Sequence, residues 1–329
     1  MNLKTDLPTQ ILARDRRAIA SALNLIDDQR PKQKMEAARL LSALSDIESK
    51  PRIGITGPPG AGKSTIINAL ATNLARQGLT TGIIAVDPSS RQTGGALLGD
   101  RIRMREHSDN EQPFLRSMAA RDRLGGISSA THAGAAILEA AFDLVIIETV
   151  GIGQSEDEVR TLVDTLVYVC QPGAGDLIQF MKAGILELPD IFVINKCDLG
   201  NSADRSLDEL RSALGLTTKT DDDWKPPVLL ASGENLTGIS ELCDQLTEHK
   251  HFLQEGIGLR RRRAGRDQFI RKEILLRYGS LGFEALGGDR VLGELCSKWH
   301  SPSPYEPLMH LDKKIRGLLQ ELLNRTNEP

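Results

Sequence analysis

A glycine-rich segment that ends in Lys63 and Ser64 offers the clearest chemistry in this sequence. Two glycines, Gly57 and Gly62, enclose four residues and are followed directly by the lysine and the serine, a spacing typical of loops that bind phosphate. Glycine lets the backbone turn so tightly that successive N–H groups point at phosphate oxygens. We expect Lys63 to reach the β- and γ-phosphates and the Ser64 hydroxyl to ligate Mg²⁺.

The residues around this segment supply the elements that such a loop needs. Residues 52–56 are mostly apolar and predict a strand, whereas residues 65–74 predict an amphipathic helix. A chance Gly/Pro turn before Lys-Ser is the alternative, and the flanking elements weigh against it. The nucleotide-binding residues predicted here are Gly57, Pro58, Pro59, Gly60, Ala61, Gly62, Lys63, Ser64 and Thr65.

A second constellation, Asn195-Lys196-Cys197-Asp198, follows an apolar run over 191–194. A carboxylate at Asp198 can accept hydrogen bonds from the ring N1–H and the exocyclic amine of guanine, and adenine has no such pair of donors. Asn195 is expected to brace the loop, and the Lys196 stem to cover the ring. An ordinary turn is the alternative, but the place of the motif at a strand end after a phosphate loop favours guanine.

Ser232 and Gly233 follow the next predicted strand, residues 228–230. Their backbone N–H groups are candidates for binding the base oxygen. Ser-Gly is also common in plain turns, so both interpretations stay open.

Several acidic residues are candidates for the metal and the attacking water. Glu148 ends a buried strand and is predicted to bind Mg²⁺ through water, with the Gly151 N–H near the γ-phosphate. Asp87, at the end of the strand 83–86, and Asp100 are further candidates for the metal or the water. A turn cap is the alternative for Asp87, and a solvated loop position is the alternative for Asp100.

The composition narrows the class of protein. The chain has 329 residues, of which 40% are hydrophobic, and a net charge of −3, which gives no general attraction to nucleic acid or to an anionic membrane. No apolar run approaches the roughly 20 residues that cross a bilayer. The four cysteines are far apart and form no CxxC pair, which favours free thiols in a reducing compartment and a cytoplasmic protein.

Alternating strand and helix patterns over 51–250 predict an α/β fold with a mostly parallel central sheet. Helical periodicity predicts an N-terminal extension over 1–50, with two helices separated by Pro31, and a C-terminal helical region over 251–329. The run of four arginines over 260–263 could bind phosphate or an acidic partner, although a solvated helix face is the favoured interpretation. Apolar positions near the C-terminus could pack internally or against a second subunit.

Taken together, these stretches resemble the MeaB/ArgK-type P-loop GTPases. The resemblance extends over nearly the whole chain and rests on these stretches: Asp15–Ala20, Gly57–Thr65, Val86–Ser90, Thr93–Met104, Glu148–Glu156 and Asn195–Asp198. It implies hydrolysis of GTP to GDP with Mg²⁺, a homodimer, and action as a chaperone and gatekeeper for an adenosylcobalamin-dependent acyl-CoA mutase such as methylmalonyl-CoA mutase.

The resemblance also implies roles for individual residues. Glu148 would replace the aspartate of small GTPases, and Asp87 and Asp100 would lie in the nucleotide site. A loop matching residues 175–182 would relay the nucleotide state through Asp176, Gln179 and Lys182. The chain departs from the family at Ala183, where a second basic residue is usual.

The sequence therefore predicts a GTPase whose catalytic residues are Lys63, Asp87, Asp100 and Glu148, with Ser64 and the three acids as metal ligands. The main alternative is a P-loop kinase, which an older family name links to amino-acid transport. A metal-inserting GTPase would need a Cys/His cluster, which the sequence does not offer near the nucleotide motifs. A passive nucleotide-binding module is the fourth possibility.

Overall fold

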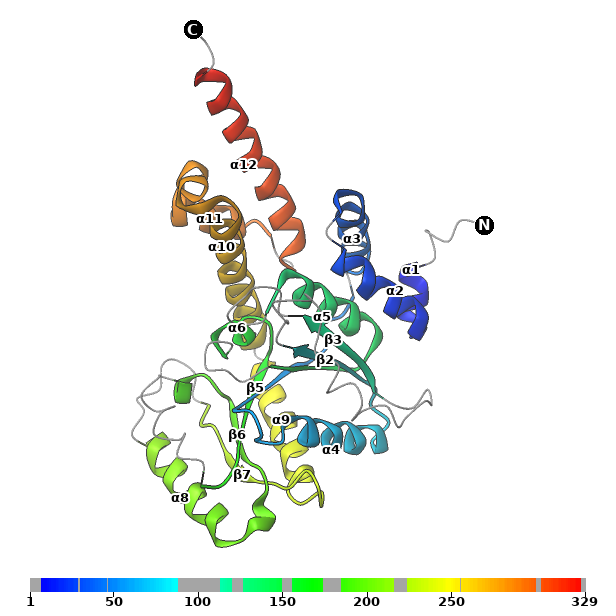
Figure 1. Ribbon diagram of the computed structural model, residues 1–329, viewed down its shortest axis with the longest axis vertical. Coiled ribbons are helices and arrows are strands. Elements are labelled where there is room, and N and C mark those ends of the chain that lie inside the picture. Colours follow the sequence, from blue (N-terminus) through cyan, green and yellow to red (C-terminus); the bar gives the residue numbers. More distant parts are fainter. Residues whose placement is uncertain are drawn as a thin grey trace.

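The computed structural model describes residues 7–28, 30–45, 47–87, 113–119, 127–149, 156–173, 185–215, 224–254, 256–299 and 303–326. A seven-stranded sheet lies at its centre, with the strand order β3-β2-β4-β1-β5-β6-β7 and only parallel pairings (Figure 1). The strands are β1 (Arg52–Thr56), β2 (Thr81–Asp87), β3 (Phe114–Ala119), β4 (Leu144–Glu148), β5 (Thr165–Cys170), β6 (Ile191–Ile194) and β7 (Val228–Leu230).

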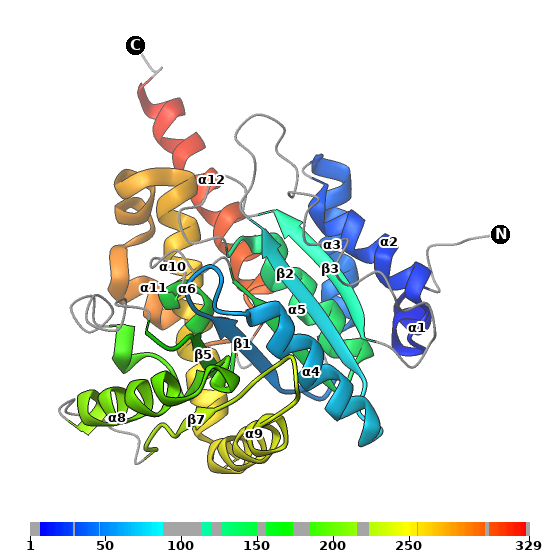
Figure 2. The same ribbon diagram turned by 60° about the horizontal axis from the view of Figure 1, so that its bottom comes forward.

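Helices cover both faces of the sheet, which confirms the predicted α/β class. One face packs on α4 (Lys63–Arg76) and α9 (Ile239–Leu253), and the other on α5 (Ser129–Ala141) and the short α6 (Glu156–Arg160), as Figure 2 shows from a second side. A further helix, α8 (Asn201–Gly215), packs on β6 and β7.

The alternation of side chains along β1 shows why both faces can be covered. Ile53 and Ile55 are buried with Ile66 and Ile67 of α4, on one face. A Cβ added at Gly54 would be on the other face, 3.2 Å from the Val159 side chain of α6. Successive strand residues point to opposite sides of the sheet. On one side β1 therefore packs on α4 through isoleucine side chains, and on the other side its glycine lets α6 approach the strand closely.

The edge strand β3 was absent from the sequence-based assignment. Its sequence, Phe-Leu-Arg-Ser-Met-Ala, places Arg116 in the middle and so breaks the apolar run expected of a buried strand. In the structure the Arg116 guanidinium leaves the sheet and donates a 2.8 Å hydrogen bond to the Asn24 side chain. A charged residue in an edge strand finds such a partner without entering the core.

In the part of the N-terminal region that the structure describes, three helices precede the sheet: α1 (Leu7–Leu12), α2 (Arg16–Asp27) and α3 (Pro31–Ala43). The sequence predicts two. Asp15 caps α2 by accepting hydrogen bonds from the Arg17 and Ala18 amides at 2.8 and 2.9 Å, and Pro31 begins α3, where its missing N–H costs nothing. Buried residues of α2 and α3 join the core of α5, so the extension is packed on the sheet domain.

The C-terminal part is formed by α10 (Ile257–Leu286), α11 (Gly288–Cys296) and α12 (Tyr305–Thr326). These helices share a core of their own, and α10 turns at Gly279, whose φ of 66° and ψ of −172° are not helical. Phe269 of α10 packs on His132 of α5 with ring centroids 3.8 Å apart. None of the helices in the described ranges is both long enough and apolar enough to cross a bilayer.

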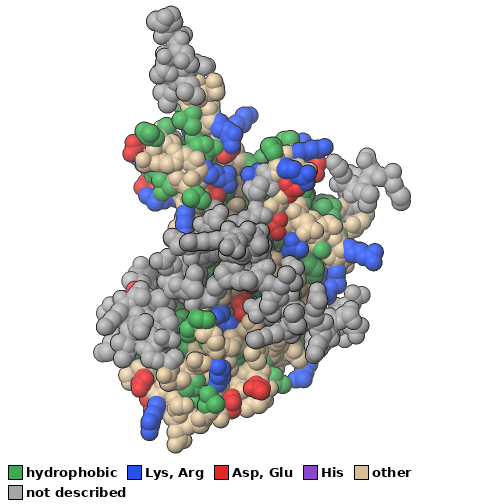
Figure 3. Space-filling model, in the orientation of Figure 1, with side chains coloured by type: hydrophobic (Ala, Val, Ile, Leu, Met, Phe, Trp, Pro, Cys, Tyr) green, Lys and Arg blue, Asp and Glu red, His purple; other side chains and the backbone are tan. Residues whose placement is uncertain are grey.

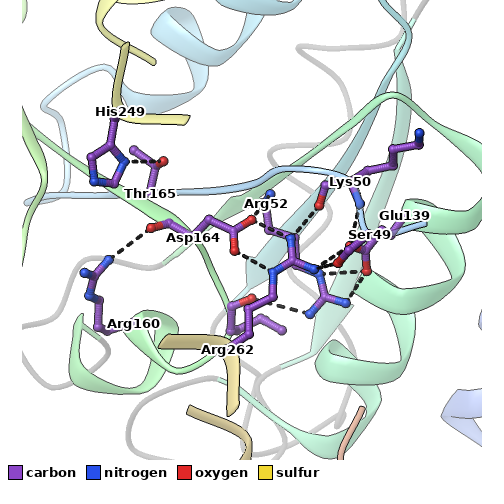
Figure 4. A network of polar contacts seen from close by, with 10 residues as sticks. Ser49, Lys50, Arg52, Glu139, Arg160, Asp164, Thr165, His249 and Arg262 are labelled. Carbon is purple, nitrogen blue, oxygen red and sulfur yellow. Dashed lines mark hydrogen bonds and ion pairs between the residues drawn. The ribbon is translucent and has the colours of Figure 1, made fainter. Parts of the chain in front are cut away.

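The arginines over 260–263 form neither a binding patch nor a fully solvated helix face, because Arg261 and Arg262 bind carboxylates within the chain. Arg262 reaches the amino-terminal side of the sheet, where it donates to Asp164 at 2.5 Å and to Glu139 at 2.7 Å (Figure 4). It also donates to the Lys50 carbonyl oxygen at 2.6 Å. Although burial by itself would lower the pKa of Arg262, the bond to Asp164 and the charges of Asp164 and Glu139 raise it.

The second of these arginines, Arg261, contacts Asp190, which lies directly before β6. Asp190 also accepts from Arg160 of α6 at 2.6 Å and lies 3.3 Å from the buried ring of His249 in α9. Burial by itself would raise the pKa of Asp190, but the adjacent His249 ring and the charges of Arg160 and Arg261 lower it to about 2. One carboxylate therefore joins α6, α9 and α10.

Arg262 gives a testable measure of how the C-terminal helices are attached. Glu139 keeps its ion pair with Arg52, but replacing Arg262 with alanine leaves Asp164, about nine-tenths buried, without its charged partner, so Arg262→Ala should cost about 3 kcal/mol of unfolding free energy. Arg260 is exposed on the same turn, and Arg260→Ala should cost less than about 0.5 kcal/mol. Urea unfolding followed by circular dichroism measures both, and equal midpoints would contradict the role given to Arg262.

Candidate functional site

The phosphate loop connects β1 to α4, as the sequence predicts. Gly57 and Gly62 have φ values of 140° and 86°, where side chains are disfavoured. A Cβ at Gly57 would lie 1.9 Å from the Val169 carbonyl oxygen, and one at Gly62 would lie 2.2 Å from the Asn195 side-chain nitrogen. The two glycines are therefore required both for the turn and for the close approach of β5 and the Asn195 loop.

Lys63 is the first residue of α4, and its side chain folds back over the loop. Its exposed fraction is 9%, and Nζ donates to the Gly57 and Pro58 carbonyl oxygens at 2.8 and 3.1 Å. This places a positive charge at the amino end of a helix, whose dipole has the same sign. A buried ammonium and a helix terminus at one loop form a site for an anionic ligand.

Ser64 and Glu148 meet although they come from different elements. The Ser64 hydroxyl donates to Glu148 Oε1 at 2.7 Å, and Glu148, the last residue of β4, is 8% exposed. Beside them, Thr149 donates to the Thr56 hydroxyl at 2.8 Å and joins the ends of β4 and β1. A hydroxyl and a carboxylate are the hard oxygen donors that Mg²⁺ prefers, so these two residues fit the predicted metal.

Asn195 holds the phosphate loop and the loop after β7 together. Its side-chain nitrogen donates to the Ala61 carbonyl oxygen at 2.8 Å, and its side-chain oxygen accepts from the Gly233 amide at 3.1 Å. Asn195 is 2% exposed. Since one amide side chain satisfies both loops, the residues predicted to bind phosphate and those predicted to bind the base form one contiguous site.

Lys196 also connects the Asn195–Asp198 motif to the phosphate loop. Its second partner, Gln171, is not among the residues predicted from the sequence. The Lys196 Nζ donates to the Gly60 carbonyl oxygen at 2.9 Å and to the Gln171 side-chain oxygen at 2.7 Å. Lys196 adopts a φ of 61°, uncommon for a residue with a side chain. Gln171 directly follows β5, so the rule that polar residues at strand ends belong to the site would have found it.

The residues predicted to bind the base differ in exposure. They are Asp198, Ser232 and Gly233. Asp198 is exposed in the short 3-10 helix η2 (Cys197–Leu199), whose first amide donates to the Ala231 carbonyl oxygen at 3.0 Å. Ser232 is 1% exposed. A Cβ at Gly233 would lie 2.9 Å from the Thr65 carbonyl carbon, so this loop packs against the first turn of α4.

Comparison with known proteins agrees with this geometry. The family model described as "Methylmalonyl Co-A mutase-associated GTPase MeaB" matches residues 19–277, well over half of the chain. A relative from Pyrococcus horikoshii whose name describes it as a GTPase is 44% identical over 79% of this chain and 82% of its own length. GTPase ArgK of Escherichia coli is 38% identical over 73% of both chains.

The chain belongs to the MeaB/ArgK-type P-loop GTPases. A solved structure described as a "LAO/AO transport system kinase" superposes on it with a TM-score of 0.69 and 27% identity, covering 91% of this chain and 98% of the other. That agreement over nearly the full length supports the same arrangement of sheet and flanking helices.

Some predicted site residues of this MeaB-family protein fall outside the described parts of the chain. Asp100 and Gly151 are among them, as are Asp176, Gln179 and Lys182 of the loop 175–182. Asp87 ends β2 in the structure, at the same edge of the sheet as Glu148, but only its backbone is described. The roles given to these residues stay predictions.

Gly233 provides a test of the packing between the base loop and α4. Gly233→Ala in this MeaB-family protein forces a Cβ against the backbone of Thr65, so we expect about a tenfold loss of affinity for GDP because the loop must move by several tenths of an ångström. Gly215 ends α8 with open space around its Cα, and Gly215→Ala should leave the affinity unchanged. Calorimetric titration with GDP compares the two variants; equal affinities would show that the loop tolerates the displacement.

Proposed function

We propose that this protein hydrolyses GTP to GDP and phosphate with Mg²⁺. The observation that carries the proposal is the single Asn195 side chain bound to both Ala61 and Gly233, because it holds the loops proposed to bind guanine against the phosphate loop. A site with this connection selects a nucleotide by its base and positions the phosphates of the same molecule.

In this proposal the residues of the phosphate loop and the metal stabilise the charge that develops on the triphosphate during hydrolysis. The loop amides and the Lys63 ammonium stabilise the negative charge of the γ-phosphate as water attacks it. Ser64 would bind Mg²⁺ directly and Glu148 through water, and the metal supplies charge neutralisation at the phosphates. Asp87 and Asp100 are the proposed residues for the metal or the attacking water, and the Gly151 amide for contact with the γ-phosphate.

The guanine base would lie between Asp198 and the stem of Lys196. Asp198 is exposed and free to accept from the two donors on one edge of guanine. The ammonium of Lys196 is held by Gly60 and Gln171, which leaves its methylene groups to cover the ring. Backbone amides of Ser232 and Gly233 are proposed to bind the base oxygen.

The proposed biological role is that of a chaperone and gatekeeper of an adenosylcobalamin-dependent acyl-CoA mutase. The name of the matching family, which refers to methylmalonyl-CoA mutase, supports this partner. We further propose a homodimer in the cytoplasm, with conformational output from loops that contact the γ-phosphate and relax after hydrolysis.

A kinase linked to amino-acid transport is the second candidate, favoured by the name of the superposing transport system kinase. The two functions differ in the fate of the γ-phosphate, which a kinase passes to an acceptor and a GTPase passes to water. With γ-labelled GTP, we expect all of the label as inorganic phosphate. Label retained on a protein or an amino acid would overturn hydrolysis as the function.

Lys63 tests the catalytic part of the proposal. Lys63→Ala removes the charge that stabilises the transferring phosphoryl group, so hydrolysis should fall by about 100-fold or more. Lys32, an exposed residue of α3, serves as the matched control, and Lys32→Ala should keep the full rate. Phosphate release measured at saturating GTP and Mg²⁺ compares the variants; an undiminished rate in Lys63→Ala would refute the site.

A substitution at Asp198 tests base selection, because it should lower the affinity for one nucleotide and raise the affinity for another. Asp198→Asn replaces an acceptor with a donor, so affinity for GDP should fall by about 100-fold and affinity for xanthosine diphosphate, which carries an oxygen at that position, should rise. The exposed Asp208 on α8 provides the control Asp208→Asn, which should keep the preference for guanine. Competition titrations measure both, and an unchanged preference in Asp198→Asn would rule out this assignment.

A further inference from the structure

Two buried hydroxyls join the end of β4 to the end of β1. Thr149 directly follows β4 and donates to the hydroxyl of Thr56, the last residue of β1, at 2.8 Å. Thr56 is 0% exposed and Thr149 is 3% exposed. Figure 3 shows charged side chains of both signs on the described surface of one face of the molecule, as is usual for a protein in water. A polar pair withdrawn from the surface is the more informative feature.

Each of the two threonines is next to a residue of the candidate site. Thr56 is followed by Gly57, where the phosphate loop begins, and Thr149 is preceded by Glu148, the carboxylate proposed for Mg²⁺. Two residues after Thr149 comes Gly151, whose amide is proposed to contact the γ-phosphate. The hydroxyl pair therefore joins the start of the phosphate loop to the segment proposed to contact the metal and the γ-phosphate.

Two consecutive residues at the end of β4 hold the phosphate loop at both of its ends. Glu148 accepts from the Ser64 hydroxyl at 2.7 Å, where the loop enters α4. Thr149 donates to Thr56, where the loop leaves β1. Because a serine hydroxyl has one proton and two lone pairs, Ser64 can donate to Glu148 and still offer a lone pair to Mg²⁺. The loop and these two residues thus form a ring that is closed by two side-chain hydrogen bonds.

The backbone beside Thr149 shows how this residue is oriented. Its amide donates to the Ile55 carbonyl oxygen at 3.1 Å, so the pairing of β4 with β1 continues one residue past Glu148. The side chain then reaches Thr56, the next residue of β1. Threonine is β-branched and has few side-chain rotamers, so its hydroxyl has a defined direction. Thr149 is held to β1 by both its amide and its side chain, and together they orient the chain that continues to Gly151.

We propose that Thr149 is a positioning residue for the hydrolysis of GTP. Its bond to Thr56 fixes the start of the segment after β4 on the start of the phosphate loop. The bond thereby keeps Glu148 and the Gly151 amide in place for the γ-phosphate and its metal. The inference rests on the proposed function, which assigns those contacts to Glu148 and Gly151. Since GDP has no γ-phosphate, the bond matters for turnover and not for the binding of GDP.

Thr149→Val tests the proposal, because valine keeps the β-branched shape and lacks the hydroxyl. We expect kcat for GTP to fall about tenfold, since a small misplacement of reacting groups is costly. The Mg²⁺ concentration that gives half of the maximal rate should rise, and the affinity for GDP without Mg²⁺ should stay that of the wild type. Thr149→Ser keeps the hydroxyl and should restore most of the rate. Phosphate release at saturating GTP measures the rates, and calorimetric titration measures the affinity for GDP.

Thr56→Val breaks the same bond from the other side and should also lower kcat. In the double variant Thr56→Val/Thr149→Val, the loss of kcat should be smaller than the product of the two single losses, because both substitutions remove one shared interaction. A loss equal to that product would show that the two hydroxyls act independently, and would overturn the proposal. If Thr149→Val does not fold and so binds no GDP, kcat and GDP affinity of Thr56→Val test the same bond.

Thr165 supplies a matched control at the opposite edge of the sheet. It is also a buried threonine, and its hydroxyl oxygen lies 2.8 Å from His249 Nδ1. Thr165→Val should keep the kcat of the wild type. An equal loss of kcat in Thr165→Val, or no recovery in Thr149→Ser, would show a general effect on the fold and overturn the proposal.

The wild type separates this inference from the proposed function. If the wild type hydrolyses GTP and Thr149→Val does so at the same rate, Thr149 is not a positioning residue, although the proposed function stands. If the wild type binds GDP but does not hydrolyse GTP, both proposals fall.

Discussion

The candidate site depends on one buried amide, the side chain of Asn195. It has one donor that reaches the phosphate loop and one acceptor that takes the Gly233 amide, so neither loop can move far without breaking a hydrogen bond. A buried amide that loses a partner is left unsatisfied, at a cost of about 1–3 kcal/mol. The glycines at positions 62 and 233 follow from this arrangement, because each allows a backbone to approach where a Cβ would collide.

A second constraint acts at the opposite edge of the sheet, where the strands begin. Arg262 joins Asp164, Glu139 and the Lys50 carbonyl oxygen, and it thereby attaches α10 to the beginnings of β1 and β5 (Figure 4). The same edge holds Asp190 with Arg160 and Arg261. The polar groups at the two edges of the sheet therefore have different roles. Those where the strands end form the nucleotide site, and those where the strands begin hold the C-terminal helices on the domain.

The sequence was sufficient for the fold class and for the centre of the site, because both follow from local patterns. Six of the seven strands are apolar runs bounded by turns, and the phosphate-loop spacing is specific enough to place Lys63 and Ser64. Strand β3 was missed because Arg116 interrupts its pattern, and its partner Asn24 is distant in sequence. Gln171 directly follows β5, so the rule for polar residues at strand ends covers it, and only its contact with Lys196 needs the structure. The anchoring role of Arg262 was missed because it is defined by contacts with Asp164 and Glu139, which are distant in sequence and which periodicity does not show.

The short helix α6 shows how the two edges are connected. It begins eight residues after Glu148 and carries Arg160, which is bound to Asp190, and Glu158, which is paired with Lys272 of α10. Where the next turn passes α10, a Cβ at Gly265 would lie 2.3 Å from the Thr161 carbonyl oxygen. There is no room for even one methyl group between the Gly265 backbone and the Thr161 carbonyl oxygen, so α6 cannot shift toward α10 alone. Close-packed interiors transmit such a displacement to their neighbours. The chain segment that follows Glu148 therefore ends on a helix that is held against α10, and through α10 against the other C-terminal helices.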